Sequence, residues 1–281
     1  MKRFDEILHK GYSQSFEVTN VLFHEKTEHQ DLVIFENPGF GRVMALDNII
    51  QVTSKDEYVY HEMLTHVPMF AKGNVTDVLI IGGGDGGILR EVLRHKTVER
   101  ATMVEIDRSV VDLCLEYFPH ISSGAFDDAR TDLIITDGVK FVAETDKRFD
   151  VIIVDSTDPM GPGEVLFTES FYGDCRRCLK DGGILVTQSG VPFFQPQELT
   201  NTFRRMGKSF QDNGFYTAVV PTYIGGFMTL GWGTDDTCLR AVDVATLKDR
   251  FAAAGLDMRY YTPEMHKAAF ALPQFIMDLM V

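Results

Sequence analysis

Val78-Leu-Ile-Ile-Gly-Gly-Gly-Asp-Gly-Gly87 joins a short, wholly apolar run to a glycine-rich loop. An apolar run of this length is typical of a strand that is covered on both faces of its sheet. Gly82, Gly84 and Gly87 fit the GxGxxG spacing, in which glycines let the backbone turn from strand to helix and approach a ligand closely. The stretch predicts a strand, a ligand-binding loop and a helix. The motif alone does not distinguish NAD from an S-adenosyl ligand.

The same alternation of apolar run, loop and amphipathic segment recurs several times after this stretch. Such units are typical of an α/β fold with a parallel sheet. The expected strands are Val78–Ile81, Ala101–Val104, Asp132–Ile135, Val151–Val154 and Ile184–Thr187. The expected helices between them are Ile88–His95, Ser109–Tyr117, Val139–Glu144 and Ser170–Cys178. The segment Pro196–Asn213 follows, and Tyr216–Val220 and Phe227–Trp232 are expected to form a pair of edge strands.

Up to about residue 70 the pattern differs, with short alternating runs separated by turn residues. The expected elements are strands within Gln14–Phe23, Gln30–Glu36 and Arg42–Leu46, and a helix over Tyr58–His66. We therefore predict a small N-terminal β-strand domain over residues 1–70 and an α/β domain with a parallel sheet over residues 71–281.

Acidic side chains outnumber basic ones, with 41 Asp and Glu against 27 Lys and Arg and a formal net charge of −14. This balance repels the phosphates of nucleic acids and anionic lipid headgroups, so we expect neither a nucleic-acid nor a membrane partner. The longest apolar run, Ala268–Leu272, is far shorter than the roughly 20 residues of a membrane-spanning helix. Asp5, Glu6 and His9 interrupt the start of the chain before a signal-sized apolar stretch develops. We expect a cytoplasmic protein.

Two motifs that elsewhere indicate metal or redox chemistry are interpreted as structural. Cys175-Arg-Arg-Cys178 lacks a second CxxC and a nearby His, and Phe171 precedes the two cysteines at helical spacing, so both cysteines are expected in a core. Four cysteines are also too few for a disulfide scaffold. His61 and His66 are too far apart for a zinc helix, because their imidazoles would lie about 140° apart around it. We expect no metal site.

Acidic residues follow four consecutive strands of the predicted sheet: Asp85, Glu105, Asp137, and the pair Asp155 and Asp158. The carboxyl ends of parallel strands meet at one edge of the sheet, where open α/β proteins bind their ligands. A single acid at such a position is often only the N-cap of the next helix. Acids at four strand ends in register indicate a ligand site.

Asp85 distinguishes between the two candidate ligand classes. Its carboxylate lies in the loop where the pyrophosphate of a dinucleotide would bind, and like charges a few ångströms apart repel. Glu105, 23 residues after Gly82, is placed to accept hydrogen bonds from a ribose diol. Asp137 and the Gly138 backbone suit an adenine edge. These residues therefore predict an adenosine pocket without a phosphate site.

A second set of residues suits a polycation. Asp155 and Asp158, with Asp85 nearby, form a candidate acidic groove, and Asp158 begins a Pro- and Gly-rich turn that is long enough to fold over a ligand. Candidate lining residues are Gln51, Tyr58, Tyr60, His61 and Tyr223. For the aromatic ones, ordinary core packing is an equally good interpretation.

A series of motifs runs in one order over nearly the whole chain. They are Tyr60-His-Glu62, Gly82-Gly-Gly-Asp-Gly-Gly87 with Leu89-Arg-Glu91, Val104-Glu-Ile-Asp107, Asp137-Gly138, Asp155-Ser-Thr-Asp-Pro159 with Gly161-Pro-Gly163, Pro221-Thr-Tyr223 and Ala269-Phe-Ala-Leu-Pro273. With this set the chain resembles the polyamine aminopropyltransferase family, most closely the members that make spermidine. The set as a whole is highly specific. Ile224 departs from it, because some members have a second tyrosine there.

The resemblance implies a small N-terminal β domain on a methyltransferase-like Rossmann catalytic domain with a mainly parallel sheet. It implies transfer of the aminopropyl group of decarboxylated S-adenosylmethionine to putrescine, which releases spermidine and methylthioadenosine. The donor is a co-substrate, so no cofactor and no metal is implied. Assembly as a homodimer or homotetramer is implied as well.

The resemblance also divides the predicted site residues into two halves. The nucleoside of the donor would be held by Gln30, Gly82, Gly84, Glu105, Asp137, Gly138 and Pro162. The amine side would be held by His61, Asp85, Asp155, Ser156, Thr157 and Asp158, with Gln51, Tyr60 and Tyr223 as further lining residues. Asp155 would be the proton acceptor.

The chemistry read from the residues agrees with this assignment. An alkyl ammonium with a pKa of about 10.4 must lose a proton before it attacks, which costs about 4 kcal/mol at neutral pH. A carboxylate base at the attacking nitrogen addresses that step. Two alternatives stay open: an S-adenosylmethionine-dependent methyltransferase of small molecules, whose methionine carboxylate Asp85 would oppose, and a non-catalytic polyamine or nucleoside sensor, which would need no base.

Overall fold

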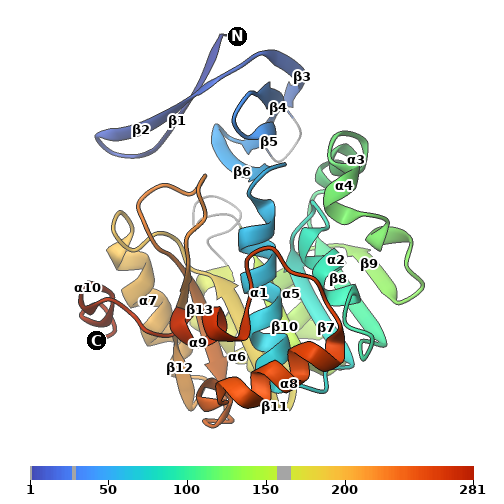
Figure 1. Ribbon diagram of the computed structural model, residues 1–281, viewed down its shortest axis with the longest axis vertical. Helices are drawn as coiled ribbons and strands as arrows, with labels where there is room; N and C mark the ends of the chain where they lie inside the picture. The colour runs from blue at the N-terminus through green and yellow to red at the C-terminus, as the bar shows by residue number, and fades with distance from the viewer. Residues whose placement is uncertain (1, 27–29, 157–165) are drawn as a thin grey trace.

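The computed structural model describes residues 2–26, 30–156 and 166–281. Short antiparallel strands form two small sheets at the start of the chain (Figure 1). One sheet is the hairpin of β1 (Arg3–His9) and β2 (Tyr12–Glu17). The other runs in the order β3 (Asn20–Lys26), β4 (Asp31–Asn37), β5 (Gly41–Leu46) and β6 (Ile49–Thr53).

The N-terminal strands differ from the prediction in number and in bounds. The run Gln14–Phe23 is two strands rather than one, because the chain leaves the hairpin at Val18 and joins the second sheet at Asn20. Strands β1 and β6 were not predicted. Both are short and mix charged or polar residues with apolar ones, so that their alternation is weak as a local signal.

The larger sheet has seven strands among the described residues, in the order β12-β13-β11-β10-β7-β8-β9. Their bounds are β7 Asp77–Gly82, β8 Arg100–Glu105, β9 Thr131–Ile135, β10 Phe149–Asp155, β11 Leu179–Gln188, β12 Asp212–Ala218 and β13 Met228–Thr234. Strands β7 to β11 are parallel, and β13 pairs antiparallel with β11 and β12. The five predicted parallel strands and the α/β fold are confirmed. Of the predicted edge pair, only β12 is itself at the edge.

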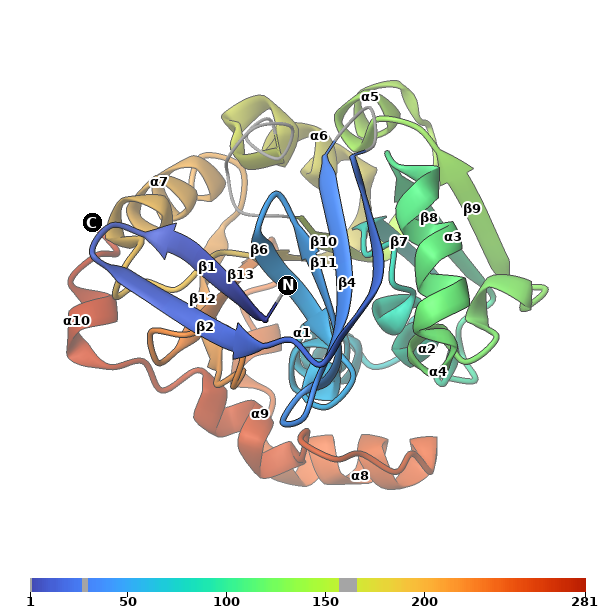
Figure 2. The ribbon, with the colours of Figure 1, turned by 90° about the horizontal axis from the view of Figure 1, so that it is seen from above.

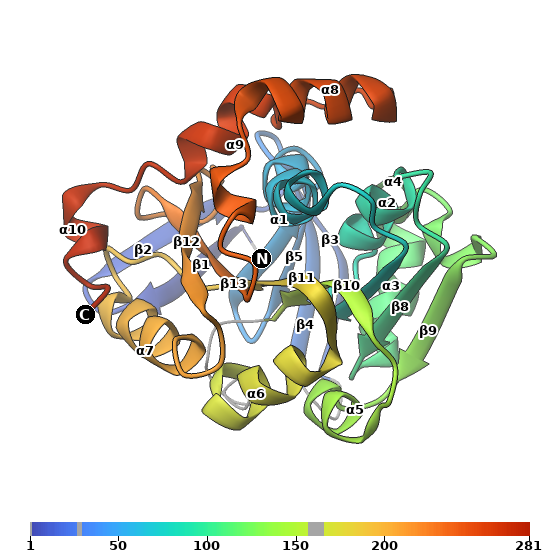
Figure 3. The same cartoon turned by 90° about the horizontal axis from the view of Figure 1, so that it is seen from below.

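Helices cover both faces of this sheet (Figure 3). On one face lie α1 (Glu57–Lys72), α2 (Gly87–Leu93), α8 (Val244–Ala254) and α9 (Pro263–Ala269). On the other face lie α5 (Gly138–Glu144), α6 (Glu169–Cys178) and α7 (Pro196–Met206). The remaining helices are α3 (Arg108–Tyr117), α4 (Pro119–Ser122) and α10 (Gln274–Met277), with short 3-10 turns at Ala125–Asp127 and Leu239–Ala241.

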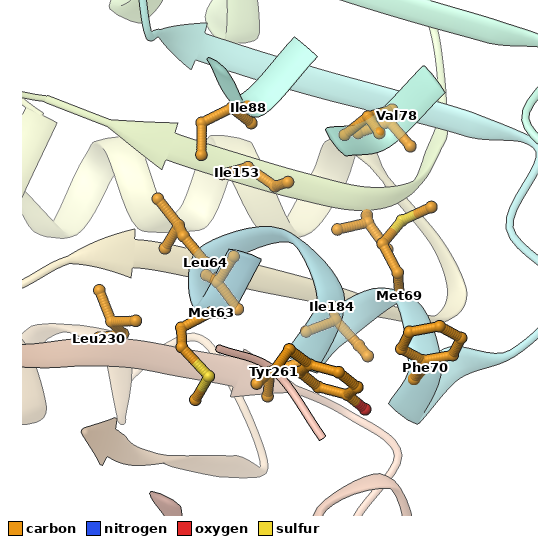
Figure 4. Packing of buried hydrophobic residues seen from close by; sticks show 14 of the residues in the cluster. Met63, Leu64, Met69, Phe70, Val78, Ile88, Ile153, Ile184, Leu230 and Tyr261 are labelled. Carbon is orange, nitrogen blue, oxygen red and sulfur yellow. The ribbon is translucent and has the colours of Figure 1, made fainter. Parts of the chain in front are cut away.

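Helix α1 is longer than predicted and is buried along nearly its whole length. The prediction ended at His66, just before Pro68, a residue type that normally interrupts helices. Here the helix continues, because residues on both sides of Pro68 pack into the main core. Met63 and Leu64 pack there with Ile153 of the sheet (Figure 4). Helix α1 therefore crosses residue 70, the predicted domain boundary. Its first turn is held in place by the same core, into which Val59 and Tyr60 pack.

The N-terminal sheets lie over the carboxyl ends of the parallel strands (Figure 2). At that edge β10 and β7 are neighbours, and Asp155 is opposite Gly82 in their register. Gly82 has a positive φ of 83°, and a Cβ added there would collide with the carbonyl oxygen of Asp155. Only glycine therefore fits at this position. The end of β10 and the start of the glycine loop are in direct backbone contact.

The cysteines are confirmed as core residues. Cys175 and Cys178 are fully buried on α6, and both are free thiols. Burial raises the pKa of the Cys175 thiol well above its usual range, which makes it unreactive.

Candidate active site

A cavity of about 500 Å³ lies between the carboxyl ends of the parallel strands and the N-terminal sheets. Except for Tyr58, it is lined by every predicted site residue that the structure describes: Gln30, Gln51, Tyr60, His61, Gly82, Gly84, Asp85, Glu105, Asp137, Gly138, Asp155, Ser156 and Tyr223. The predicted residues Thr157, Asp158 and Pro162 lie outside the described residues. Tyr58 does not line the cavity, because its ring packs under the Arg259 guanidinium, 3.6 Å from the ring centroid.

One end of the cavity is built by the loops after β7, β8 and β9. Glu105 ends β8, where its Oε1 accepts a hydrogen bond of 2.9 Å from the Asp107 amide. Burial raises the pKa of the Glu105 carboxyl to about 7. Gln30 reaches this end from the N-terminal sheet and donates to Asp107 Oδ2 at 3.2 Å. A buried carboxyl with this spacing from the glycine loop suits a ribose diol.

Asp137 is both a helix N-cap and a cavity-lining residue, two roles that were alternatives at the sequence level. Its Oδ1 accepts a hydrogen bond of 2.8 Å from the Val139 amide, so that it is the N-cap of α5. The same residue lines the cavity. At Gly138 a Cβ would collide with Ile81, so the helix begins as close to the sheet as a backbone can. This arrangement brings a carboxylate and a helix N-terminus to the cavity wall together.

Asp155 ends β10 and lies between the glycine loop after β7 and Tyr60 of α1. The Tyr60 hydroxyl donates to Asp155 Oδ1 at 2.6 Å. Burial and the negative charge of Asp85 raise the pKa of Asp155 to about 6, against the opposing effects of His61 and Tyr60. A carboxylate with this pKa is mostly ionised at pH 7 and more basic than an ordinary aspartate. Both properties suit a general base.

His61 lies between two carboxylates in the first turns of α1. Its Nδ1 is 2.6 Å from Glu57 Oε2, and its Nε2 is 3.2 Å from Asp85 Oδ2. Burial favours the neutral imidazole, but Asp85 and Glu57 outweigh it and raise the pKa of His61 to about 10. Arg90 donates to Glu57 Oε2 at 2.9 Å and completes the chain of charges. His61 is therefore a fixed imidazolium beside Asp85.

Asp85 is held by the start of the next helix as well as by His61. Its Oδ1 accepts a hydrogen bond of 2.7 Å from the Gly87 amide. The carboxylate is thus oriented by one backbone donor and one cation. The sequence predicted its position in the loop but not its partner, and the partner offsets part of its charge.

The far wall combines α1 with the loop after β12. The Tyr223 ring packs edge-on against the Tyr60 ring, with 5.8 Å between the centroids. The Tyr223 hydroxyl donates to the backbone carbonyl of Gln51. The Gln51 side chain turns back to its own strand, where it donates to the Ile49 carbonyl at 3.1 Å. Gln51 thus anchors Tyr223 through its main chain.

Sequence reasoning missed several polar lining residues and one supporting residue. The missed lining residues include Glu6, Gln188, Gln195 and Thr222, and the supporting residue is Glu57. Gln188 directly follows the predicted strand Ile184–Thr187, so extending the strand-end search to the fifth strand finds it. Glu57 lies four residues before His61, but the predicted helix began one residue too late to pair them. Glu6 had no signal, because its strand was not predicted.

The two histidines of α1, His61 and His66, have different partners. His66 Nε2 is 2.8 Å from Glu91 Oε2, and its Nδ1 is 2.9 Å from His95 Nε2. This cluster is buried between α1 and α2. Arg90 links it to the His61 cluster, because the guanidinium pairs with both Glu91 and Glu57. Within residues 2–26, 30–156 and 166–281 no group of three or more His, Cys, Asp or Glu is arranged to hold a metal ion. In the same ranges no helix has the length and apolarity to cross a bilayer.

Comparisons with known proteins agree over the whole chain. Residues 57–243 match the family model described as the spermine/spermidine synthase domain, and residues 3–54 match the spermidine synthase tetramerisation domain. Polyamine aminopropyltransferase 1 of Pseudomonas aeruginosa is 58% identical over 99% of this chain and 97% of its own. The polyamine aminopropyltransferase of Escherichia fergusonii is 56% identical over 99% of this chain and 96% of its own.

Solved structures give the same result. A spermidine synthase in complex with the transition-state analogue AdoDATO has a TM-score of 0.94 at 37% identity, covering 99% of this chain and 94% of that one. The spermidine synthase of Thermotoga maritima has a TM-score of 0.91 at 35% identity, covering 99% and 93%. The predicted resemblance is confirmed: this chain belongs to the spermine/spermidine synthase family, the polyamine aminopropyltransferases.

Proposed function

We propose that this enzyme transfers the aminopropyl group of decarboxylated S-adenosylmethionine to putrescine and releases spermidine and methylthioadenosine. The observation that carries the proposal is the position of Asp155. It ends β10 beside the glycine loop, with a nucleoside-type end on one side and the aromatic wall of Tyr60 and Tyr223 on the other. Membership in the family and the likeness to spermidine synthases support the same reaction.

The reaction balances with one proton acceptor. The amine nitrogen of putrescine attacks the propyl carbon attached to the sulfonium, the new C–N bond forms as the C–S bond breaks, and the electron pair goes to sulfur. The putrescine ammonium gives one proton to Asp155 before the attack, so that the nitrogen attacks as a neutral amine. Because the leaving group is a neutral thioether, no general acid is required. Holding amine and sulfonium in line supplies much of the remaining rate.

Each end of the cavity then has its own part in binding. Glu105 takes the ribose, and Asp137 with the Gly138 amide takes the adenine edge, beside Gln30 and the glycine loop. Asp85 attracts the ammonium of the donor, and the aromatic wall takes the methylene chain of putrescine. Thr157, Asp158 and Pro162 complete the site in this proposal by their motif positions.

Three further features belong to the proposal. The reaction proceeds without a cofactor or a metal, so that EDTA leaves the rate unchanged. The chain assembles into a homodimer or homotetramer through residues 3–54, which match the tetramerisation domain, and light scattering on the purified protein distinguishes the two. The enzyme acts in the cytoplasm.

The test is a product assay with purified protein and a matched pair of donors. Decarboxylated S-adenosylmethionine with putrescine should give spermidine and methylthioadenosine in equal amounts. S-adenosylmethionine, which tests for methyl transfer, should give neither S-adenosylhomocysteine nor a methylated amine. Cadaverine and longer diamines measure the acceptor range. Binding of both ligands without turnover would show a sensor and overturn the proposal.

A further inference from the structure

Asp56, immediately before α1, is an N-cap residue that does not cap its own helix. At the starts of α3, α5 and α8, Asp107, Asp137 and Asp243 each accept a hydrogen bond from an amide of the helix that follows. Such a bond typically stabilises a helix by about 1 kcal/mol. The Asp56 side chain makes no bond of this kind. Both of its oxygens are instead used elsewhere.

The Asp56 carboxylate joins two segments that are distant in sequence. Oδ1 accepts from the Thr53 hydroxyl at 2.6 Å, at the end of β6. Oδ2 accepts from the Thr222 amide at 2.8 Å and from the Thr222 hydroxyl. Asp56 is 6% exposed and Thr222 is 1% exposed, so these bonds are shielded from water. Removing the carboxylate would leave buried donors unpaired.

Thr222 transmits this constraint to the cavity. Its neighbour Tyr223 lines the cavity and donates to the backbone carbonyl of Gln51. Gln51 lies on β6, the strand that ends at Thr53. The Thr222 carbonyl accepts from Gln14 of the β1–β2 hairpin at 3.0 Å. Thr222 therefore links the loop after β12, the start of α1 and the N-terminal hairpin.

We infer that Asp56 is a positioning residue for the amine acceptor, which holds Tyr223 at the aromatic wall through Thr222. The inference rests on the proposed function. Tyr60, Glu105 and Asp155 are placed by α1 and by the parallel strands instead. Loss of Asp56 should therefore weaken acceptor binding and spare both donor binding and the chemical step.

The experiment compares Asp56→Ala with Asp56→Asn in steady-state kinetics. Asp56→Ala should raise the KM for putrescine about tenfold or more, while kcat stays within about threefold and the donor KM is unchanged. Asp56→Asn should restore the wild-type KM, because its oxygen can accept from Thr222 and its amide can donate to the Thr53 hydroxyl. Should Asp56→Ala fold poorly, Thr222→Val removes the hydroxyl alone and should give a smaller rise in the same KM.

Two controls separate positioning from general destabilisation. Asp243→Ala removes the N-cap of α8, where the Asp243 carboxylate accepts from the amide and the hydroxyl of Thr246, and it should leave the putrescine KM unchanged. Amide hydrogen exchange over residues 219–226 reports the Asp56–Thr222 bond whether or not the enzyme turns over. Faster exchange without a change in KM, or a loss in kcat alone, would overturn the inference. An inactive wild-type enzyme would instead overturn the proposed function.

Discussion

The two halves of the cavity are built in different ways. The nucleoside half comes from consecutive strands of one sheet, with Glu105 at the end of β8 and Asp137 two residues after β9. The amine half combines α1, the loop after β12 and the N-terminal sheets, and it depends on contacts such as Tyr223 to Gln51 between residues 172 positions apart. The geometry of the nucleoside half is set by the sheet, and the geometry of the amine half is set by how separate segments pack on that sheet.

Asp155→Asn tests the residue at which the two halves meet, and we expect the largest effect there. The amide can still accept from Tyr60 but cannot take the proton of the ammonium, so kcat should fall by about 10²–10⁴. Methylthioadenosine binding should be retained, which calorimetry checks. Turnover at the wild-type rate across neutral pH would exclude Asp155 as the base.

Asp85→Asn tests how far one carboxylate sets donor choice. Decarboxylated S-adenosylmethionine presents only an ammonium to Asp85, whereas S-adenosylmethionine adds a carboxylate that Asp85 repels. Two isolated unit charges about 4 Å apart at an effective dielectric of 20 interact by about 4 kcal/mol. The His61 imidazolium offsets part of the negative charge of Asp85 and so weakens the interaction.

We therefore expect Asp85→Asn to narrow the preference between the two donors by about tenfold, which corresponds to ~1.4 kcal/mol. Competition binding of both donors to wild type and variant measures the ratio. The same ratio in both proteins would mean that another residue sets donor choice.

Glu105→Gln should affect the nucleoside half alone. A neutral amide accepts more weakly from a ribose diol than a carboxylate does, so methylthioadenosine affinity should fall about tenfold while putrescine affinity stays unchanged. The pKa of Glu105 is about 7, so acidification through pH 7 protonates the carboxyl and should weaken nucleoside binding by wild type. The Gln variant should lose this pH dependence. Equal losses for both ligands would contradict the division of the cavity.

Tyr60→Phe should give the smallest effect, seen as a shift in pH dependence. The Tyr60 hydroxyl lowers the pKa of Asp155, so its loss should raise that pKa above about 6 and leave less of the base ionised at pH 7. We expect the acid limb of kcat/KM to move to higher pH, with activity recovering at alkaline pH. Tyr216→Phe, which removes a buried hydroxyl bonded to the Met63 carbonyl, is the control and should leave the limb in place.

The sequence predicted the residues at strand ends better than those on docked segments, for a physical reason. A buried parallel strand must be apolar on both faces, so its end is visible locally, and Asp85, Glu105, Asp137 and Asp155 were found by that rule. Docked segments leave no comparable local signal. Asp56 acts through Thr222, a residue 166 positions away that only the folded chain brings close. Glu57 was missed because the predicted helix began one residue too late, and Glu6 lies on a strand too weakly patterned to predict.

The contact between Gly82 and the Asp155 carbonyl also limits how members of this fold can diversify. Neighbouring strands are about 4.8 Å apart in any sheet, so the separation between the donor loop and the proposed base is set by backbone pairing rather than by side-chain length. A new acceptor can therefore be accommodated by substitutions at the rim formed by Tyr223, Gln51 and the hairpin, while this backbone separation stays constant. Changing the separation itself would require a different sheet.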